Sequence, residues 1–234
     1  MKQEEFIQEL KKLNIIINNH QLEQLEEYYN LLIEWNKVMN LTGITKQEEV
    51  YLKHFYDSLT ILKVIDLNTV ENLCDVGTGA GFPGIVLKIL FPNLKITLID
   101  SLNKRINFLN EVITKLNLKN IEAIHCRIEE YGIKNREKYD IVVARAVAQL
   151  NILLEYCIPI VKINGYFIAM KGNSEEEINN SQQALNKLNS NIEIWEIFKL
   201  PIENSIRTIL KIKKNKITDK KFPRKYSEIK KHPL

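Results

Sequence analysis

The stretch that decides the fold is Leu73–Pro92, LCDVGTGAGFPGIVLKILFP, which places four of the chain's eight glycines within eight residues. An apolar segment leads into these glycines, and a helical pattern that begins at Pro83 follows them. This order predicts a strand, a glycine-rich turn and a helix, the arrangement in which open α/β sheets bind ligands. Each glycine gives up backbone entropy that alanine would keep, so we expect a ligand to need bare backbone at close range.

Strands and helices alternate along the chain from about residue 70 onward. The predicted strands are 71–77, 95–100, 121–126, 139–145, 165–172, 192–200 and 206–214. Helical patterns fill most of the gaps, over 83–91, 104–116, 148–162 and 175–189. This alternation predicts a Rossmann-like α/β sheet of mostly parallel strands. The last two predicted strands have little between them, so we expect an antiparallel end to the sheet.

The predicted organisation has three parts. Residues 1–66 form a helical extension, with helices in 6–15, 18–41 and 46–65 and with Asn19 as a cap. Residues 67–213 form the α/β domain, and residues 214–234 form a basic tail. From Lys211 to Leu234 the net charge is +8, whereas the remaining 210 residues carry −4. The tail has few apolar residues, so we expect it to be loosely ordered.

Composition bears on compartment and partners. No apolar run approaches the roughly 18 residues of a membrane span, and the charged start MKQEEFIQELKK is not typical of a secretory signal. The three scattered cysteines have neither metal-ligand spacing nor the pattern of a disulfide framework. We therefore expect a cytoplasmic protein with no bound metal and no membrane partner. The sequence leaves the oligomeric state open, and we expect a monomer.

Two kinds of phosphate-binding loop are alternatives for this glycine-rich turn. No G-K-[ST] closes the run, which excludes a P-loop. Residues 79–84 match the dinucleotide fingerprint G-x-G-x-x-G, but counted from Gly77, where the turn should start, Phe82 replaces the third glycine. Asp75 lies under the loop, where its carboxylate would repel a pyrophosphate but suit the positive charges of S-adenosylmethionine. An NAD-dependent dehydrogenase is therefore the lesser alternative.

The segment Asp75–Gly81, DVGTGAG, resembles the D-x-G-x-G-x-G loop of class I methyltransferases position for position. Asp100 ends the second predicted strand, where a carboxylate can accept both ribose hydroxyls, so S-adenosylmethionine is the predicted cofactor. The segment ARAVAQL stands where amine methylases carry D/N-P-P-Y/F, and no Pro-Cys pair serves carbon methylation. No carboxylate–histidine cluster serves oxygen methylation. An acceptor with a free lone pair, such as a ring nitrogen, remains.

Six motifs occur in the order and spacing of one family. They are WNKVMNLTG (35–43), HFYDSL (54–59), DVGTGAGFPGI (75–85), LIDSLNKRINFL (98–109), VVARAVA (142–148) and MKG (170–172). These motifs are similar to those of the ribosomal RNA small-subunit methyltransferase G family, also called glucose-inhibited division protein B. Two departures are Ala144, where many members have Ser, and Phe82, which often is Leu. The resemblance implies a class I methyltransferase fold and methylation of N7 of one guanine in 16S ribosomal RNA.

The same resemblance implies a set of donor-binding residues, which are Gly77, Phe82, Asp100, Ser101, Leu102, Ile128, Glu129 and Arg145. The loop itself adds Asp75 and Gly79 to this set. Guanine N7 has a lone pair and no proton to remove, so we expect no general base. Arg145 would act by positioning, through guanine O6, a phosphate or the carboxylate of the donor.

Weaker signals concern RNA. Asn40, Lys104, Arg105 and Lys171 are candidate RNA contacts, although a structural role is as plausible for each. The same holds for His54, and the basic tail would either grip phosphates or only increase solubility. Aromatic residues at helical spacing near the N-terminus, namely Tyr28, Tyr29 and Trp35, are more typical of a core. A non-catalytic RNA-binding ribosome assembly factor that retains the fold is the main alternative function.

Overall fold

Seven strands form a single sheet at the centre of the computed structural model, which describes residues 1–172 and 175–234. They are β1 (Asn72–Val76), β2 (Lys95–Asp100), β3 (Ile121–His125), β4 (Tyr139–Arg145), β5 (Val161–Lys171), β6 (Ser190–Lys199) and β7 (Ile206–Lys214). The order is β3-β2-β1-β4-β5-β7-β6. The first five strands run parallel, and β7 pairs antiparallel with both β5 and β6. The expected Rossmann-like sheet with an antiparallel end is confirmed.

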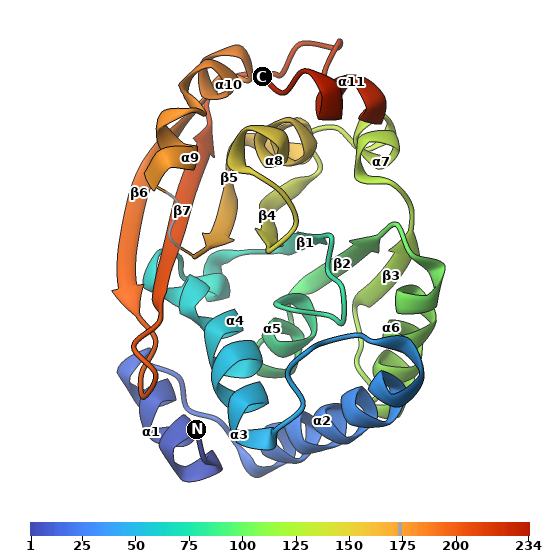
Figure 1. The fold of residues 1–234 in the computed structure, drawn as a ribbon, viewed down its shortest axis with the longest axis vertical. Helices are drawn as coiled ribbons and strands as arrows, with labels where there is room; N and C mark the ends of the chain where they lie inside the picture. The colour runs from blue at the N-terminus through green and yellow to red at the C-terminus, as the bar shows by residue number, and fades with distance from the viewer. Residues whose placement is uncertain (173–174) are drawn as a thin grey trace.

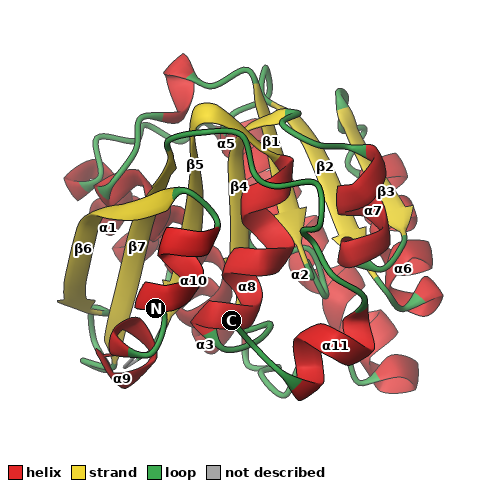
Figure 2. Ribbon diagram, turned by 90° about the horizontal axis from the view of Figure 1, so that it is seen from above, coloured by secondary structure: helices red, strands yellow, loops and turns green. Residues whose placement is uncertain are grey.

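Helices cover both faces of the sheet, as Figures 1 and 2 show. One face carries α1 (Gln3–Lys12), α2 (Asn19–Met39), α3 (Gln47–Val50), α4 (Asp57–Leu59), α5 (Gly84–Leu90) and α6 (Asn103–Lys115). The other face carries α7 (Ile128–Lys134), α8 (Leu150–Cys157), α9 (Glu175–Asn179), α10 (Gln182–Lys187) and α11 (Tyr226–Lys231). Short 3-10 turns span Thr60–Lys63, Leu67–Thr69 and Ile158–Ile160. Within the described ranges no helix has both the length and the apolar character needed to cross a membrane.

Alternation along the strands divides the apolar residues between two cores. On β4, Ile141 and Val143 face the core under the N-terminal helices, whereas Val142 and Ala144 face the core under α8. Successive side chains of a strand point to opposite faces, so a strand buried on both faces is apolar throughout. This is why the strand segments of this chain read as nearly continuous apolar runs.

The N-terminal helices differ from their predicted form in two ways. The cap of α2 is Asn18 and not Asn19, since the Asn18 side chain accepts from Gln21 N at 2.9 Å and Gln21 returns the bond at 3.1 Å. The predicted helix over 46–65 is interrupted by a π-helical segment, Tyr51–Tyr56. Such segments are rare and occur frequently at functional sites.

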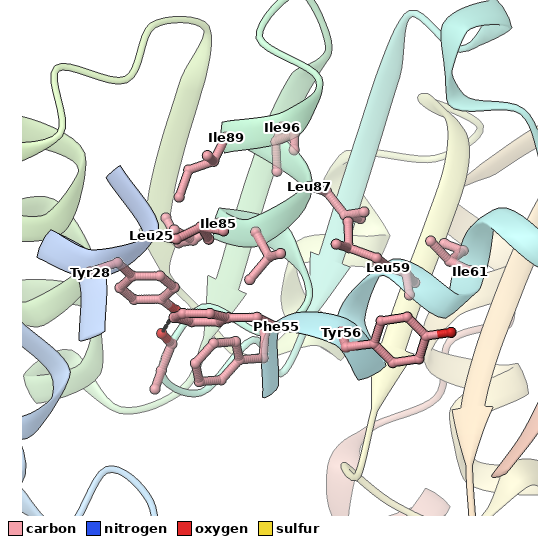
Figure 3. Packing of buried hydrophobic residues seen from close by; sticks show 14 of the residues in the cluster. Leu25, Tyr28, Phe55, Tyr56, Leu59, Ile61, Ile85, Leu87, Ile89 and Ile96 are labelled. Carbon is pink, nitrogen blue, oxygen red and sulfur yellow. Dashed lines mark hydrogen bonds between the residues drawn. The ribbon is translucent and has the colours of Figure 1, made fainter. Parts of the chain in front are cut away.

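The π-helical segment packs directly on α2. The rings of Tyr28 and Phe55 lie nearly parallel with their centroids 5.6 Å apart, and Figure 3 shows them against each other in the core. Tyr28 is fully buried and donates a hydrogen bond to the carbonyl of Ala80 in the glycine loop. The core role expected for the aromatic residues of α2 is confirmed, and through Tyr28 that core supports the loop.

The expectation of a loosely ordered tail is wrong. Phe222 and Ile229 are buried against α7 and α8, and α11 ends the chain with a helix that the sequence did not indicate. Arg224 makes a two-pronged ion pair with Glu155 of α8, with N···O distances of 2.8 and 2.6 Å. The tail therefore packs on the sheet's second helical layer (Figure 2).

Candidate functional site

The loop between β1 and α5 is fastened to the carboxyl ends of two strands. The amides of Gly77 and Thr78 donate to Ile99 O of β2 at 2.8 and 3.1 Å. Asp100, the last residue of β2, accepts from Gly79 N at 3.0 Å. These bonds hold the loop open above the sheet edge, where parallel α/β sheets bind ligands.

Asp75 lies beneath this loop. One carboxylate oxygen accepts from Thr78 Oγ1 at 2.7 Å and from Gly84 N at 2.8 Å, so the carboxylate fixes both ends of the turn. The other oxygen, Oδ1, is buried and has no hydrogen-bond partner among the described residues. Burial raises the pKa of Asp75 to about 6. Asp75 borders neither of the cavities described below, so its contacts support the loop geometry and not a direct donor contact.

The four glycines of the loop have different structural roles. Gly77 has φ +67°, and a Cβ there would lie 2.6 Å from Cγ2 of Val147. Gly79 has φ +61°, and a Cβ there would approach no atom closer than 4.0 Å, so its backbone faces open space. At Gly81 and Gly84 a Cβ would come within 2.5 and 2.2 Å of side chains behind the loop. The expected approach of a ligand therefore suits Gly79, whereas Gly77, Gly81 and Gly84 permit close packing against side chains.

One cavity, which we call the Asp100 cavity, lies at the ends of β2 and β3 and has a volume of about 390 Å³. Its walls include five of the residues predicted to bind the donor, namely Gly77, Asp100, Ser101, Ile128 and Glu129. Apolar walls with a few polar acceptors are typical of a site for a small organic ligand. Leu102 lies outside this lining and is 42% exposed. Its amide donates to Asp100 Oδ1 at 2.9 Å, so its backbone orients the carboxylate.

Asp100 has three protein donors. Besides the amides of Gly79 and Leu102, Arg105 Nη1 donates to Oδ2 at 3.0 Å. An ionised carboxylate offers about four lone-pair positions, so beside these three bonds one acceptor position is left, enough for one ligand hydroxyl and not for both ribose hydroxyls as expected from the sequence. Arg105, predicted as an RNA contact, pairs with Asp100 and borders the second cavity.

The second cavity, which we call the Arg145 cavity, shares the lining residue Gly77 with the first and has a volume of about 570 Å³. Gly79, Phe82 and Arg145 of the predicted donor set line it. The guanidinium of Arg145 lies over the Phe82 ring, with its carbon 5.3 Å from the ring centroid. The donor residues predicted from the sequence are thus divided between two adjoining cavities.

Asp57 is the shared ion-pair partner of two arginines in the Arg145 cavity. Its two oxygens accept from Arg145 Nη1 and Arg207 Nε, each at 3.0 Å, and its side chain is only 8% exposed. One buried carboxylate therefore holds two guanidinium groups, one from β4 and one from β7. The two guanidinium groups carry one more charge than Asp57 neutralises. This excess positive charge at the cavity wall favours an anionic or electron-rich ligand.

His54, from the π-helical segment, lies beside Arg145, with Nδ1 3.5 Å from Nη2. Its ring stacks on Phe82 at a centroid distance of 4.4 Å, and Nε2 shares a hydrogen bond with Thr42 Oγ1 at 2.8 Å. Burial, followed by the charge of Arg145, lowers the pKa of His54 to about 3. The ring is therefore neutral near pH 7 and orders the cavity wall without adding charge.

The remaining predicted RNA contacts have structural partners or exposed positions. Lys171 donates to Ala148 O at 2.8 Å and pairs with Glu177 at 2.6 Å, on the wall of the Arg145 cavity. Asn40 lies just after α2, which it ends with φ +48°. Lys104 is exposed at the start of α6. Asn40 and Lys104 belong to the described lining of neither cavity.

Several site residues escaped the sequence analysis. Asp57 lies within HFYDSL, so the motif located it without revealing its role. Arg207 carries no local signal, because its partner is 150 residues away. Ala146 has φ +56°, a left-handed conformation that is costly for a residue with a Cβ. Such conformations cluster at functional sites, and this one adjoins Val147, which lies over Gly77.

Comparisons with known proteins agree with this geometry. A sequence model of the family described as rRNA small subunit methyltransferase G matches residues 21–205. The chain is 50% identical to Ribosomal RNA small subunit methyltransferase G of Bacillus subtilis (strain 168), over 100% of this chain and 99% of that protein. The protein of the same name from Bacillus thuringiensis (strain Al Hakam) shows the same identity and coverage.

Solved structures share the fold at low sequence identity. A SAM dependent methyltransferase from Aquifex aeolicus superposes with a TM-score of 0.55 at 19% identity, covering 74% of this chain and 96% of that chain. M. jannaschii TYW2 in complex with AdoMet gives a TM-score of 0.52 at 16% identity, covering 62% and 69% of the two chains. At these identities the likeness concerns the fold alone.

Proposed function

The chain belongs to the rRNA small subunit methyltransferase G family, and on that premise we propose that it transfers the methyl group of S-adenosylmethionine to N7 of one guanine in 16S ribosomal RNA. The observation that carries this proposal is that two cavities lie on either side of the loop and share Gly77 in their linings. One has the apolar walls and carboxylate acceptors of a nucleoside site, and the other is larger and lined by guanidinium groups. A transfer between two substrates needs such a junction.

The residues of the Asp100 cavity fit the nucleoside half of the donor. Asp100 keeps an acceptor position for a ribose hydroxyl, and Ser101, Ile128 and Glu129 lie beside it. Gly79, with no atom close to its Cβ position, leaves room for the methionine half above the loop. Asp75 and Leu102 support this site from outside the cavity, through the loop and through Asp100.

S-adenosylmethionine supplies an electrophilic methyl group when it is bound. Because guanine N7 has an in-plane lone pair and no proton, the chain has no proton to remove, and its contribution is positioning. Arg145 and Arg207 present N–H donors to the Arg145 cavity, where guanine O6 or a neighbouring phosphate would accept them. Asp57 keeps both guanidinium groups in place.

Further parts of the proposal concern the protein in the cell. We propose that it acts in the cytoplasm as a monomer, with the 16S RNA or the small ribosomal subunit as its partner. The division into a helical extension (1–66), a methyltransferase domain (67–213) and a basic tail (214–234) stays a prediction. The packing of Tyr28 on the loop indicates that the extension contributes to the rigidity of the site.

Two measurements test the proposal. Titration calorimetry with S-adenosylmethionine should give binding, whereas titration with NAD should give none, which separates the methyltransferase from the dehydrogenase. By mass spectrometry, 16S fragments from a deletion strain should lack one N7-methylguanosine. Expression of the wild-type chain in that strain should restore this modification. A variant Arg145→Ala that still binds the donor should not restore it. Restoration by that variant would show that Arg145 is dispensable for the transfer, whereas a fully methylated deletion strain would favour a non-catalytic assembly factor.

Point substitutions test whether the tail binds RNA. Truncation is unsuitable because it would also remove Arg224 and leave the buried Glu155 without its partner. Lys216 and Lys220 are exposed and suit the test. If they bind phosphates, the double variant Lys216→Ala/Lys220→Ala should bind 16S fragments less tightly. The salt slope should become shallower by roughly 0.7–0.9 for each phosphate that the variant no longer binds. An unchanged slope would assign these lysines to solubility.

A further inference from the structure

The C-terminal segment 214–234 is fastened to the body of the protein along its length. Arg136 donates to the carbonyls of Thr218 and Phe222, and Arg224 pairs with the fully buried Glu155. Ile229 is fully buried in the core under α8. Removing one partner of a buried pair is strongly destabilising, so these anchors fix where α11 lies.

These anchors place α11 at the mouth of the Asp100 cavity. Tyr226 and Lys230, on successive turns of α11, line the cavity together with Asp100, Ser101 and Ile128. The aromatic ring of Tyr226 is thus brought beside the ends of β2 and β3 from the far end of the chain. Both α11 and α7 lie on the same face of the sheet (Figure 1), and Arg127, which precedes α7, contacts the ring of Tyr226.

A chain of contacts fixes the ring of Tyr226. The guanidinium carbon of Arg127 lies 3.9 Å from the ring centroid, which is a close cation–π contact. Arg127 Nε in turn donates to Glu129 Oε1 at 2.7 Å, and Glu129 is buried in the cavity wall. The ring is held, yet Tyr226 remains 40% exposed. An aromatic ring that is fixed in place and still exposed at a cavity has surface to bury against a ligand at low entropic cost.

We propose that Tyr226 is a donor-binding residue and that segment 214–234 forms the outer wall of the donor pocket, against the nucleoside half of S-adenosylmethionine. The identity of the ligand rests on the proposed function, whereas the position of the wall rests on the contacts above. Purine rings stack on or pack against aromatic side chains with sizeable gains in affinity. This part of the basic tail therefore contacts the donor and not RNA.

The experiment is titration calorimetry on the full-length chain with S-adenosylmethionine and with 5′-methylthioadenosine, which keeps only the nucleoside half. Tyr226→Ala should weaken the binding of both ligands by about tenfold, within the range for losing an aromatic contact with a base. Tyr226→Phe keeps the ring and should bind within about twofold of wild type. Because Tyr226 is 40% exposed, these variants should keep the wild-type midpoint of thermal unfolding.

Tyr166→Ala is the matched control. Tyr166 lies on β5 with Lys211 Nζ 4.2 Å from its ring centroid, so it makes the same kind of contact, but it is outside the described lining of both cavities. Its removal should leave the affinity for both ligands unchanged. Wild-type affinity in Tyr226→Ala would overturn the assignment, as would a loss for S-adenosylmethionine without a loss for 5′-methylthioadenosine. A wild-type chain that binds neither ligand would refute the proposed function itself.

Discussion

Replacing Asp57 with alanine tests how the Arg145 cavity is built. The carboxylate accepts from Arg145 and Arg207 at 3.0 Å each, and its side chain is 8% exposed. Removing one member of a buried ion pair costs about 3–5 kcal/mol, because the remaining charge stays desolvated. The two arginine side chains are 13% and 23% exposed, so water partly solvates them. We therefore expect Asp57→Ala to lower the free energy of unfolding by about 2–4 kcal/mol.

Urea unfolding followed by circular dichroism measures this change, and Glu203→Ala is the control. Glu203 pairs with Lys53, a residue of the same cavity wall, at 2.8 Å, but the two side chains are 30% and 26% exposed. Surface pairs of this kind contribute about 0–1 kcal/mol. If Asp57→Ala costs no more than Glu203→Ala, the buried double pair is not what holds the two arginines.

The same variant separates positioning from donor binding. Asp57 lines the Arg145 cavity and does not belong to the described lining of the Asp100 cavity. The dissociation constant for S-adenosylmethionine should therefore stay near wild type, while methyl transfer to 16S fragments falls. Equal losses in both would place Asp57 in the donor site instead.

Three further variants test the loop and the buried histidine. Asp100→Ala should weaken S-adenosylmethionine binding by about 1.5–3 kcal/mol, the range for hydrogen bonds to a charged group; an unchanged calorimetric constant would move the ribose site elsewhere. Gly79→Val should abolish donor binding, because its side chain would enter open space above the loop, while the circular dichroism spectrum stays near wild type; normal binding would separate the loop from the ligand. For His54, the folded-state pKa of about 3 lies below the unfolded value of about 6.5, so the unfolded chain binds more protons and stability falls as pH drops from 6.5 toward 3. His54→Gln should flatten the unfolding free energy against pH between about 6.5 and 4, and an unchanged slope would contradict the neutral, buried ring.

The sequence by itself determined the sheet and the place of the loop. Strands such as Lys95–Asp100 and Tyr139–Arg145 have the predicted bounds, because runs of apolar residues are a local signal for buried parallel strands. The glycine spacing located the turn, and the end of β2 located Asp100, since the carboxyl ends of parallel strands meet at one edge. Short helices were harder: α7 and α11 were missed, and 175–189 is two helices, α9 and α10. A six- or seven-residue helix repeats its apolar pattern too few times to be recognised.

The tertiary structure alone decided which groups meet across long separations. Asp57 and Arg207 are 150 residues apart, and Arg224 and Glu155 are 69 apart, so no spacing in the sequence relates them. Gly81 and Gly84 look like ligand-facing positions in the sequence, but side chains from other elements fill the space behind them. The tail looks disordered by composition, yet a few buried residues and one buried ion pair suffice to dock it. Desolvation makes such long-range pairs decisive, because a buried charge must find its partner wherever in the chain that partner lies.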